Sequence, residues 1–220
     1  MEDLAAVSRS SPEDRSLAER STHDLLNPVS AILGLGETIR SRGSSLGDDT
    51  IRSFGESIVR QAERLESALR DLERASFLLR EDPSVALADV LVEDVLSPLA
   101  SDRVRIESAP GLRLRADREL LSNALGRLVE NALAFSGGDV VVRARAGWIE
   151  VADRGTGFTQ ESLANAFEPL APGTNARNER GRGLGFGLYI ARRLLEAQGG
   201  TLTAVSSPGE GSVFRIELPG

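Results

Sequence analysis

Residues 181–200 read GRGLGFGLYIARRLLEAQGG, a run of alternating glycines that leads directly into an amphipathic helix. Backbone N–H groups at the start of a helix form a natural site for an anion such as a phosphate group. The stretch resembles the glycine fingerprint of dinucleotide-binding folds only superficially, because its glycines alternate and it does not follow the first strand of the chain. It predicts a helix near 184–198 with an anion site at its beginning.

The composition narrows the class of protein. Residues 137–220 hold 15 of the 22 glycines and residues 1–82 hold five, which predicts a helical first part and a turn-rich last part. With no cysteine and one histidine, the chain has no disulfide, no thiol catalysis and no multi-histidine metal site. The net charge of −7 argues against nucleic acid as a partner, and all 26 basic residues are arginines. No apolar run approaches the roughly 20 residues of a membrane helix, so we expect a cytoplasmic chain without a membrane segment.

Two stretches before residue 83 carry the seven-residue apolar period of long helices that pack together. The first, from about 16 to 42, repeats at Ala18, Leu25, Ile32 and Ile39. The second is more regular and repeats at Ile51, Ile58, Leu65, Leu72 and Leu79. One helical hairpin has too little core to be stable alone, so we expect two copies to pair into a four-helix bundle. The sequence thus predicts a flexible leader over 1–14 and a homodimer through residues 15–82.

An α/β pattern follows over 83–220, after Glu81, Asp82 and Pro83 end the second helix. Short turns predict three antiparallel hairpins, which pair 103–108 with 112–115, 139–146 with 148–153, and 201–207 with 211–218. A short strand is expected at 85–87, and helices are expected at 88–101, 117–135 and 160–166. Asp117 is expected to open the helix over 117–135. Because the hairpins are antiparallel, a doubly wound parallel fold is not expected.

The single histidine, His23, lies in the sequence THDLLNPVSAIL, on the polar side of the first helix. Asp24 is adjacent and Asn27 is one turn further on, a spacing at which helical side chains meet. Pro28 is unusual there, since a proline inside a helix normally costs about 3 kcal/mol. A lone exposed histidine is more often an ordinary surface residue, so this motif alone does not decide the function.

Two further motifs lie in the α/β part of the chain. The sequence ENALAFS places Glu130 and Asn131 late in a helix, and DRGTGF places Asp153 at the end of a strand, just before Gly155 and Gly157. Glycines at such positions permit positive φ angles and a close approach of the backbone to a ligand. Each pattern also occurs in ordinary polar helices and turns, so the information lies in the order and spacing of all the motifs.

In that order and spacing, the motifs resemble those of the catalytic core of bacterial sensor histidine kinases, over about residues 15–220. HDLLNPV is similar to the phosphoacceptor box, RLVENALAFS to the N box, DRGTGF to the first glycine motif, FEPL to the F box and GRGLGFGL to the second glycine motif. The resemblance implies a dimerisation and histidine phosphotransfer domain over 15–82, a helical hairpin that forms a dimeric four-helix bundle. It also implies a catalytic ATP-binding domain over 83–220, a Bergerat-type α/β sandwich with a mixed, largely antiparallel sheet, as in gyrase, Hsp90 and MutL proteins.

The resemblance also implies a phosphoacceptor chemistry. His23 would accept the γ-phosphoryl group of ATP on one ring nitrogen, and Asp24 would hydrogen-bond the other nitrogen. Asn27 would position a water when the enzyme works in reverse as a phosphatase of its partner. That partner would be a response-regulator receiver domain, which receives the phosphoryl group on an aspartate and docks near His23.

An ATP and magnesium site is implied by the same resemblance. Asp153 would accept the adenine amino group, and Asn131 would coordinate Mg²⁺ through its amide oxygen. Gly155 and Gly157 would let backbone and water approach the base. The phosphates would lie against Gly181, Gly183 and Gly185. Residues 168–182 would form a lid, anchored by Phe167 and carrying the cations Arg177, Arg180 and Arg182.

Two departures from the family pattern concern phosphate binding. The N box usually begins with Asn, where this chain has Arg127, and it usually has a basic residue where this chain has Ala134. The missing cation at 134 weakens phosphate neutralisation. Arg127 either supplies a substitute from one turn away or pairs with Glu130 and disturbs magnesium binding, and the sequence does not choose between these.

The leading hypothesis is therefore an ATP-dependent protein histidine kinase. A second hypothesis is a histidine phosphotransferase or docking scaffold with a degenerate ATP domain, which the departures at 127 and 134 favour and the intact glycine motifs oppose. A serine kinase of the anti-sigma type would share the ATP domain but leaves the phosphoacceptor hairpin unexplained.

Overall fold

The computed structural model describes residues 12–169 and 185–219, with side chains described from residue 25 onward. The chain divides into two compact units, Met1–Arg70 and Asp71–Gly220. The expected boundary at residue 83 remains a prediction, and the last two turns of the second long helix belong by their contacts to the second unit. None of the helices in the described ranges is long and apolar enough to span a membrane.

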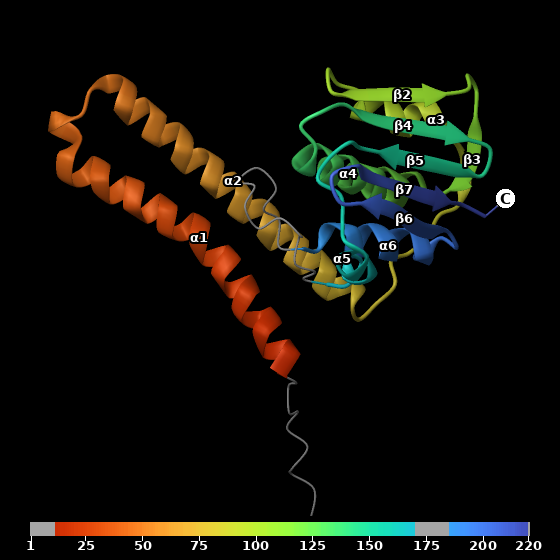
Figure 1. The fold of residues 1–220 in the computed structure, drawn as a ribbon, viewed down its shortest axis with the longest axis horizontal. Coiled ribbons are helices and arrows are strands. Elements are labelled where there is room, and N and C mark those ends of the chain that lie inside the picture. The colour runs from red at the N-terminus through yellow and green to blue at the C-terminus, as the bar shows by residue number, and fades with distance from the viewer. Residues whose placement is uncertain (1–11, 170–184, 220) are drawn as a thin grey trace, which may run out of the picture. The chain divides into compact units, whose positions relative to one another are not determined.

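The first unit is a helical hairpin (Figure 1). Helix α1 (Pro12–Arg42) and helix α2 (Asp48–Leu78) are joined by a short 3-10 turn, η1 (Gly43–Ser45). Two acidic residues, Asp48 and Asp49, lie in the first turn of α2, where negative charge is favourable. None of the side chains described between 25 and 70 is buried, and Leu33 and Leu69 are 66% and 50% exposed. The hairpin of one chain thus leaves its apolar stripe uncovered.

The second unit is built on a five-stranded sheet with the order β2-β4-β5-β7-β6. Strands β4 (Val140–Arg145) and β5 (Trp148–Ala152) form one expected hairpin, and β6 (Thr201–Ser207) and β7 (Gly211–Glu217) form another. The order of the strands makes β5 and β7 antiparallel neighbours as well. The expected mixed, largely antiparallel sheet is confirmed, because among the strands of residues 12–169 and 185–219 only β2 and β4 pair in parallel.

The expected hairpin of 103–108 with 112–115 is wrong. Strand β2 (Val104–Ser108) pairs with β4, and β3 (Arg113–Ala116) pairs with β1 (Ala88–Leu91) in a separate two-stranded sheet. The pairing that forms places buried apolar side chains directly opposite each other across each pair of strands. Val104 lies beside Val140, and Val90 lies beside Leu114, and all four side chains are buried.

The expected helix over 88–101 is also shorter than predicted. Residues 88–91 form β1, and the strand expected at 85–87 therefore begins later. Helix α3 (Val92–Leu96) follows and ends in a 3-10 turn, η2 (Ser97–Leu99). Pro98 lacks the amide hydrogen that would continue the α-helical ladder, which accounts for the early end.

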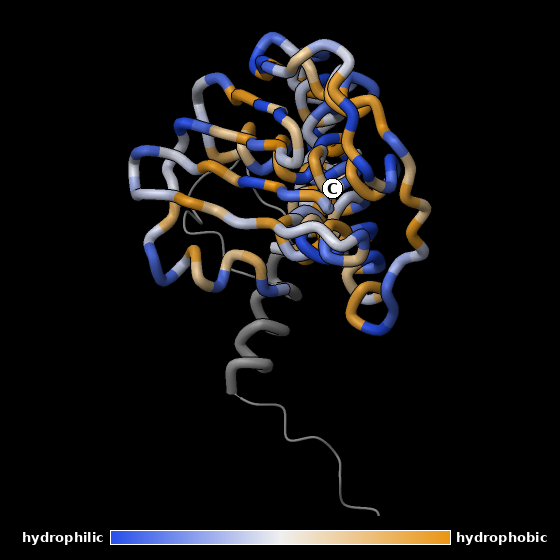
Figure 2. Tube along the Cα trace, turned by 90° about the vertical axis from the view of Figure 1, so that its right-hand side faces the viewer, coloured by the Kyte–Doolittle hydropathy of each residue, from blue (hydrophilic) through white to orange (hydrophobic). Residues whose placement is uncertain are grey.

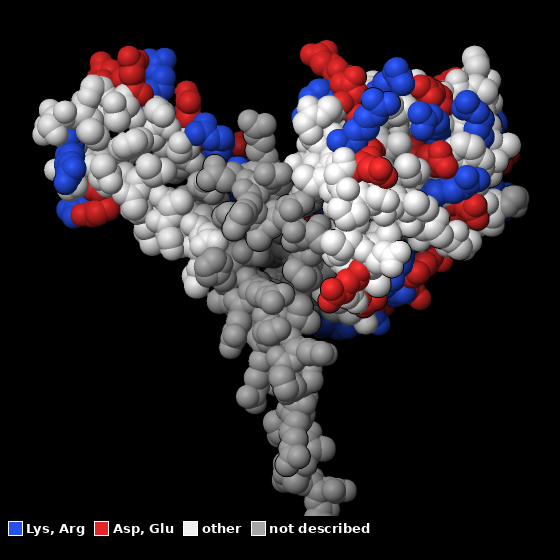
Figure 3. Space-filling view, viewed as in Figure 1, with Lys and Arg blue, Asp and Glu red and all other residues white. Residues whose placement is uncertain are grey.

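Two helices cover one face of the sheet (Figure 1). They are α4 (Arg118–Phe135) and α6 (Gly187–Ala197), which pack on each other and present Leu121, Leu125, Ile190 and Leu194 to the core. Buried and less buried residues alternate along β4, β5 and β7. Figure 2 shows hydrophilic and hydrophobic residues interspersed along the trace of the second unit. The other face of the sheet carries interspersed positive and negative side chains (Figure 3), including the ion pairs of Arg143 with Glu107 and Arg215 with Glu150.

Candidate nucleotide-binding site

The expected base-recognition residue, Asp153, follows directly after β5 and is 8% exposed. Its carboxylate oxygen Oδ1 accepts a hydrogen bond from the Gly155 backbone N–H at 2.7 Å. Burial raises the pKa of Asp153, and hydrogen bonds from the backbone of Gly155 and Ser212 offset part of this effect. A buried carboxylate held in a fixed orientation suits a single directed contact with a ligand amino group.

The loop after Asp153 is closely packed against backbone. A Cβ on Gly155 would lie 2.4 Å from the Phe135 carbonyl oxygen. Gly157 has a φ of +63°, and a Cβ there would lie 2.0 Å from the Ser207 carbonyl oxygen. These two glycines are thus required by contacts within the protein, a stronger reason than the approach of a ligand that the sequence suggested.

Gly211 is a third glycine of this kind, which the sequence analysis did not single out. Its φ is +90°, and a Cβ would lie 2.1 Å from the Asp153 carbonyl oxygen. In the sequence, the pair Gly209 and Gly211 at the beginning of the last strand could have indicated such a position. The Gly209 N–H also donates a hydrogen bond to the Thr156 carbonyl at 2.8 Å. The turn between β6 and β7 therefore supports the loop that carries Asp153.

Asn131, the expected magnesium ligand, lies on α4 one turn before the point where this loop docks. The Thr156 N–H donates to the carbonyl of Phe135 at 3.3 Å, and Phe135 is four residues after Asn131. Asn131 thus lies one helical turn from the residue to which the Asp153 loop is hydrogen-bonded, near the C-terminal end of α4. The Asn131 side chain is half-buried, and among the described residues nothing hydrogen-bonds it.

These residues fit a magnesium–nucleotide ligand in their chemistry. Within the described ranges, no three histidine, cysteine or acidic residues cluster to hold a metal ion by themselves. Mg²⁺ commonly takes one or two protein oxygens together with phosphate oxygens and water. The unpartnered amide of Asn131 can supply such an oxygen.

Arg127 does not pair with Glu130. Its Nη1 lies 2.7 Å from the Asp71 carboxylate, and its Nε donates to the Asn123 side-chain oxygen at 3.2 Å. The side chain thus points toward the N-terminus of α4, as helical side chains generally do. Glu130 is exposed, so the idea that Arg127 disturbs magnesium binding through Glu130 has no support in this contact pattern.

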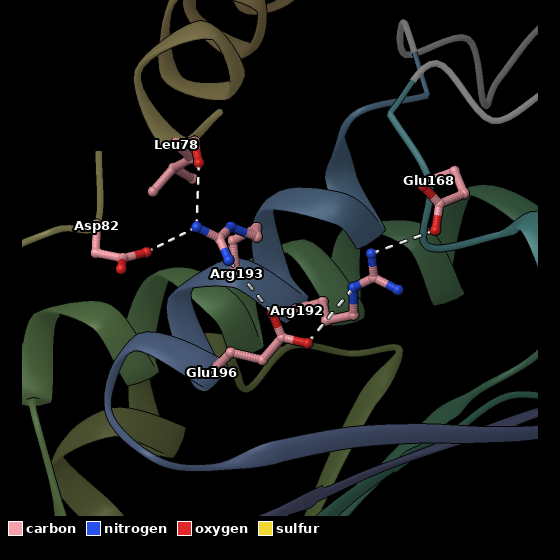
Figure 4. Close-up of polar contacts among 6 residues, drawn as sticks. All are labelled: Leu78, Asp82, Glu168, Arg192, Arg193 and Glu196. Atoms are coloured by element: carbon pink, nitrogen blue, oxygen red, sulfur yellow. Dashed lines mark hydrogen bonds and ion pairs between the residues drawn. The ribbon is translucent and has the colours of Figure 1, made fainter. Parts of the chain in front are cut away.

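Phe167 is half-buried after helix α5 (Gln160–Asn165), with its ring set edge-on to the buried Phe214 at 6.4 Å. The Arg192 guanidinium lies 5.8 Å from the centre of the Phe167 ring. Arg192 also reaches the Glu168 carboxylate at 3.4 Å (Figure 4). Phe167 and Glu168, the residue before the expected lid and the first residue of it, are therefore both in contact with α6, which fits the expected role of Phe167 as an anchor.

At the start of α6, Gly185 has a φ of +75° and Gly187 is the first helical residue. The expected phosphate-binding residues Gly181 and Gly183 lie outside the described residues. So do the expected lid cations Arg177, Arg180 and Arg182.

The expected phosphoacceptor residues lie in α1. His23 and Asp24 fall within the helix, and their side chains lie outside the described part of the chain. Asn27 is half-buried and interacts with another residue, and Pro28 lies inside the helix as predicted.

Asp117 was predicted to open α4, and it does more than cap the helix. Its Oδ1 accepts the N–H groups of Glu119 and Leu120, each at 3.0 Å, and its Oδ2 accepts the Ala86 N–H at 2.7 Å. Burial of Asp117 acts to raise its pKa, but these three backbone hydrogen bonds together outweigh it and lower the pKa. Asp117 thus fixes the beginning of the helix that carries Asn131.

The end of α2 is held by α6. Arg193 donates from Nη2 to the Leu78 carbonyl at 3.3 Å and to the Asp82 carboxylate at 2.7 Å (Figure 4). A cation at the last carbonyls of a helix is favourable for its dipole. Glu196 lies 3.7 Å from Arg192 Nε and 3.7 Å from Arg193 Nη1, between the two arginines. Two adjacent arginines of α6 thereby contact Glu168, at the start of the expected lid, and the end of α2.

Residues 116–220 match the family model of the histidine kinase-, DNA gyrase B-, and HSP90-like ATPase. The sensor-like histidine kinase SenX3 of Mycobacterium tuberculosis is 31% identical over 233 residues, which cover 99% of this chain and 56% of SenX3. The histidine protein kinase DivJ of Caulobacter vibrioides is 31% identical over 225 residues, which cover 93% of this chain and 37% of DivJ. The chain thus spans about half of SenX3 and about a third of DivJ.

Two solved structures share the fold of this chain. The crystal structure of full-length ShkA in complex with AMPPNP superposes with a TM-score of 0.63 at 26% identity, over 96% of this chain and 46% of ShkA. The histidine kinase AdeS of Acinetobacter baumannii has a TM-score of 0.63 at 21% identity, over 89% of this chain and 96% of AdeS, and it shows the fold. The chain is thereby identified as a histidine kinase catalytic core, and its residues 116–220 belong to the histidine kinase-, DNA gyrase B- and HSP90-like ATPase family.

Proposed function

We propose that the chain is an ATP-dependent protein histidine kinase of a two-component system. The observation that carries this proposal is the buried Asp153, oriented by the Gly155 N–H in a loop that docks one turn after Asn131. ShkA, whose structure contains AMPPNP, is similar to this chain along 96% of its length, which supports ATP as the nucleotide.

In this proposal Asp153 accepts the adenine amino group, and Gly155 and Gly157 shape the loop around the base. Asn131 supplies an amide oxygen to Mg²⁺, whose chemistry at this site is to neutralise phosphate charge. Phe167 anchors the lid. The further residues proposed for the phosphates and the lid are Gly181, Gly183, Gly185, Arg177, Arg180 and Arg182.

The phosphoryl transfer itself falls to His23. One ring nitrogen attacks the γ-phosphorus, an N–P bond forms, and the bond to the bridging oxygen breaks so that ADP leaves. Asp24 accepts a hydrogen bond from the other ring nitrogen and stabilises the positive charge that develops there. A receiver domain then takes the phosphoryl group on an aspartate, and Asn27 positions the water when the reaction runs as a phosphatase.

Two copies of the chain would pair through residues 15–82 to complete a four-helix bundle. The support is the hairpin described above, in which no side chain between 25 and 70 is buried although the apolar stripe repeats every seven residues. Such a face needs a partner, and a second copy supplies a matching stripe.

Incubation with γ-labelled ATP and Mg²⁺ tests the proposal. Wild-type protein should acquire an acid-labile label, as expected of a phosphohistidine, and His23→Gln should acquire none. Ser30→Ala, about two turns further along the same face of α1, is a matched control that should be labelled normally. A label that survives in His23→Gln would contradict the assignment.

The alternative is a histidine phosphotransferase or docking scaffold with a degenerate ATP domain. The observation in its favour is that α4 carries no cation after Arg127, whose guanidinium is held by Asp71. Calorimetry with ADP and Mg²⁺ separates the two functions. A kinase should bind ADP, and Asp153→Asn should bind it much more weakly; no binding to the wild type, with phosphate exchange from a phosphorylated receiver, would favour the scaffold.

A further inference from the structure

The pair of Arg127 and Asp71 joins the start of the second unit to the helix that carries Asn131. The two side chains are 15% and 19% exposed, and the closest nitrogen and oxygen lie 2.7 Å apart. Breaking a pair that is this buried leaves two charges poorly solvated, so Arg127 will leave Asp71 only for another anion. Asp71 belongs to a packed segment, since Ala75 and Leu78 of the same two turns are buried.

The position of Arg127 on α4 makes the phosphates of a bound nucleotide a candidate anion that could replace Asp71 as the partner of the guanidinium. Arg127 lies four residues before Asn131 and therefore on the same helical face. It is the one basic residue of α4 after Arg118, in a helix that the structure describes completely. A triphosphate beside Asn131 carries more negative charge than one carboxylate, and a guanidinium binds phosphate oxygens in a bidentate manner.

We propose that Asp71 and the phosphates of the bound nucleotide compete for Arg127. Nucleotide binding and the docking of residues 71–78 are then negatively coupled, because one guanidinium serves both. The coupling is reciprocal, so whatever strengthens the hold of Asp71 weakens nucleotide affinity by the same factor. This inference rests on the proposed function, in which the site binds Mg-ATP.

A double-mutant cycle in the full chain tests the competition, with dissociation constants for Mg-ADP and for Mg²⁺ with a non-hydrolysable ATP analogue. Asp71→Asn should tighten binding of the ATP analogue by about fivefold or more, the usual range of such couplings. The gain should disappear in an Arg127→Gln background, which keeps a group able to bond Asn123. Glu73→Gln removes an exposed charge of the same helix and should change the affinity little.

Hydrogen exchange gives an independent readout. Adding the ATP analogue should speed the exchange of backbone amides in residues 71–78 of the wild type, and should leave this segment unchanged in Asp71→Asn.

Three results would overturn the inference. The first is an affinity of Asp71→Asn for the ATP analogue that is equal to or weaker than that of the wild type. The second is a gain in affinity from Asp71→Asn that persists in the Arg127→Gln background, or that is no larger than the gain from Glu73→Gln. The third is slower exchange of residues 71–78 with nucleotide. Wild-type protein that binds no nucleotide would contradict the proposed function itself, whereas wild-type binding with an unchanged Asp71→Asn contradicts the competition alone.

Discussion

Two buried aspartates of the second unit have pKa values shifted in opposite directions. Asp117 is stabilised in its ionised form by three backbone N–H groups, whereas burial dominates at Asp153 and raises its pKa. The difference follows from their tasks. Asp117 holds a helix in place. In the proposed function, Asp153 keeps a carboxylate in a poorly solvated position for a ligand, which costs stability in the absence of that ligand.

Replacing Asp153 with asparagine should therefore weaken nucleotide binding without weakening the fold. Asparagine keeps an oxygen for the Gly155 N–H but loses the charge that the adenine amino group would meet, so the affinity for ADP should fall about tenfold or more. Because the folded-state pKa of Asp153 is raised, its stabilising contribution is present at low pH and is lost as the pH rises through that pKa. The stability of Asp153→Asn relative to the wild type should accordingly be higher at pH 7 than at pH 4, as measured by urea unfolding.

Replacing Asp117 with alanine should destabilise the second unit by about 1–2 kcal/mol through the lost helix cap, with a further loss from the unpaired Ala86 N–H. The lowered pKa of Asp117 means that its contribution is present above its unfolded-state pKa and is lost as the pH falls through its folded-state value. The difference between variant and wild type should thus shrink in acid. Urea unfolding at pH 7 and pH 4 measures this difference in the free energy of unfolding. The control is Asp139→Ala, at an exposed position, which should change stability little. Equal losses in both variants would contradict the role of Asp117.

At the scale of elements, the site is an arrangement of a loop, a turn and a helix end held together by backbone. The loop after β5 touches the end of α4 through Phe135 and the turn between β6 and β7 through Gly209. Glycine is needed where these backbones meet, because a Cβ on Gly157 or Gly211 would overlap a carbonyl oxygen. The shape of the loop that we propose to bind the base is therefore fixed by contacts within the protein.

Gly157→Ala should show this directly. The positive φ and the overlap with the Ser207 carbonyl should cost about 1–3 kcal/mol and should shift the loop enough to weaken ADP binding. Gly126→Ala is a matched control in the middle of α4, where a Cβ would meet nothing within 4 Å and alanine should raise stability by about 0.5–1 kcal/mol. Thermal unfolding and ADP calorimetry of both variants make the comparison. A Gly157→Ala variant with the stability and ADP affinity of the wild type would contradict the need for glycine at this position.

Elements whose partners are close in sequence were predictable, and those with distant partners were not. The pairs β4 with β5 and β6 with β7 follow from short turns at Gly147 and Gly209, and Asp117 marks the start of α4 through its own side chain. The parallel pairing of β2 with β4 depends on which buried valines meet across the sheet. The same holds for Arg127, since no local pattern indicates that its partner is Asp71 on another helix.

At the scale of the whole molecule, the uncovered hairpin determines the expected assembly. Wild-type protein should sediment as a dimer at micromolar concentration, and the double variant Leu33→Asp with Leu69→Asp should sediment as a monomer, because charges would then enter an apolar interface. Both leucines are at least half exposed in one chain. The control is Val205→Asp, at a residue that is 75% exposed on β6, and it should remain dimeric. A monomeric wild type, or a dimer that survives the double change, would contradict the four-helix bundle.

The docking of residues 71–78 has a practical consequence for fragments of this protein. A fragment that begins near Pro83, where the second long helix was predicted to end, would lack the buried side chains of Ala75 and Leu78. It would also lack Asp71, the carboxylate that pairs with Arg127. The fragment would expose the apolar surface against which Ala75 and Leu78 pack, beside arginines that have lost their partners, and it should therefore tend to aggregate. Starting the gene at residue 68 instead retains the whole docked segment, so the isolated ATP-binding domain should be easier to purify and crystallise with its native surface.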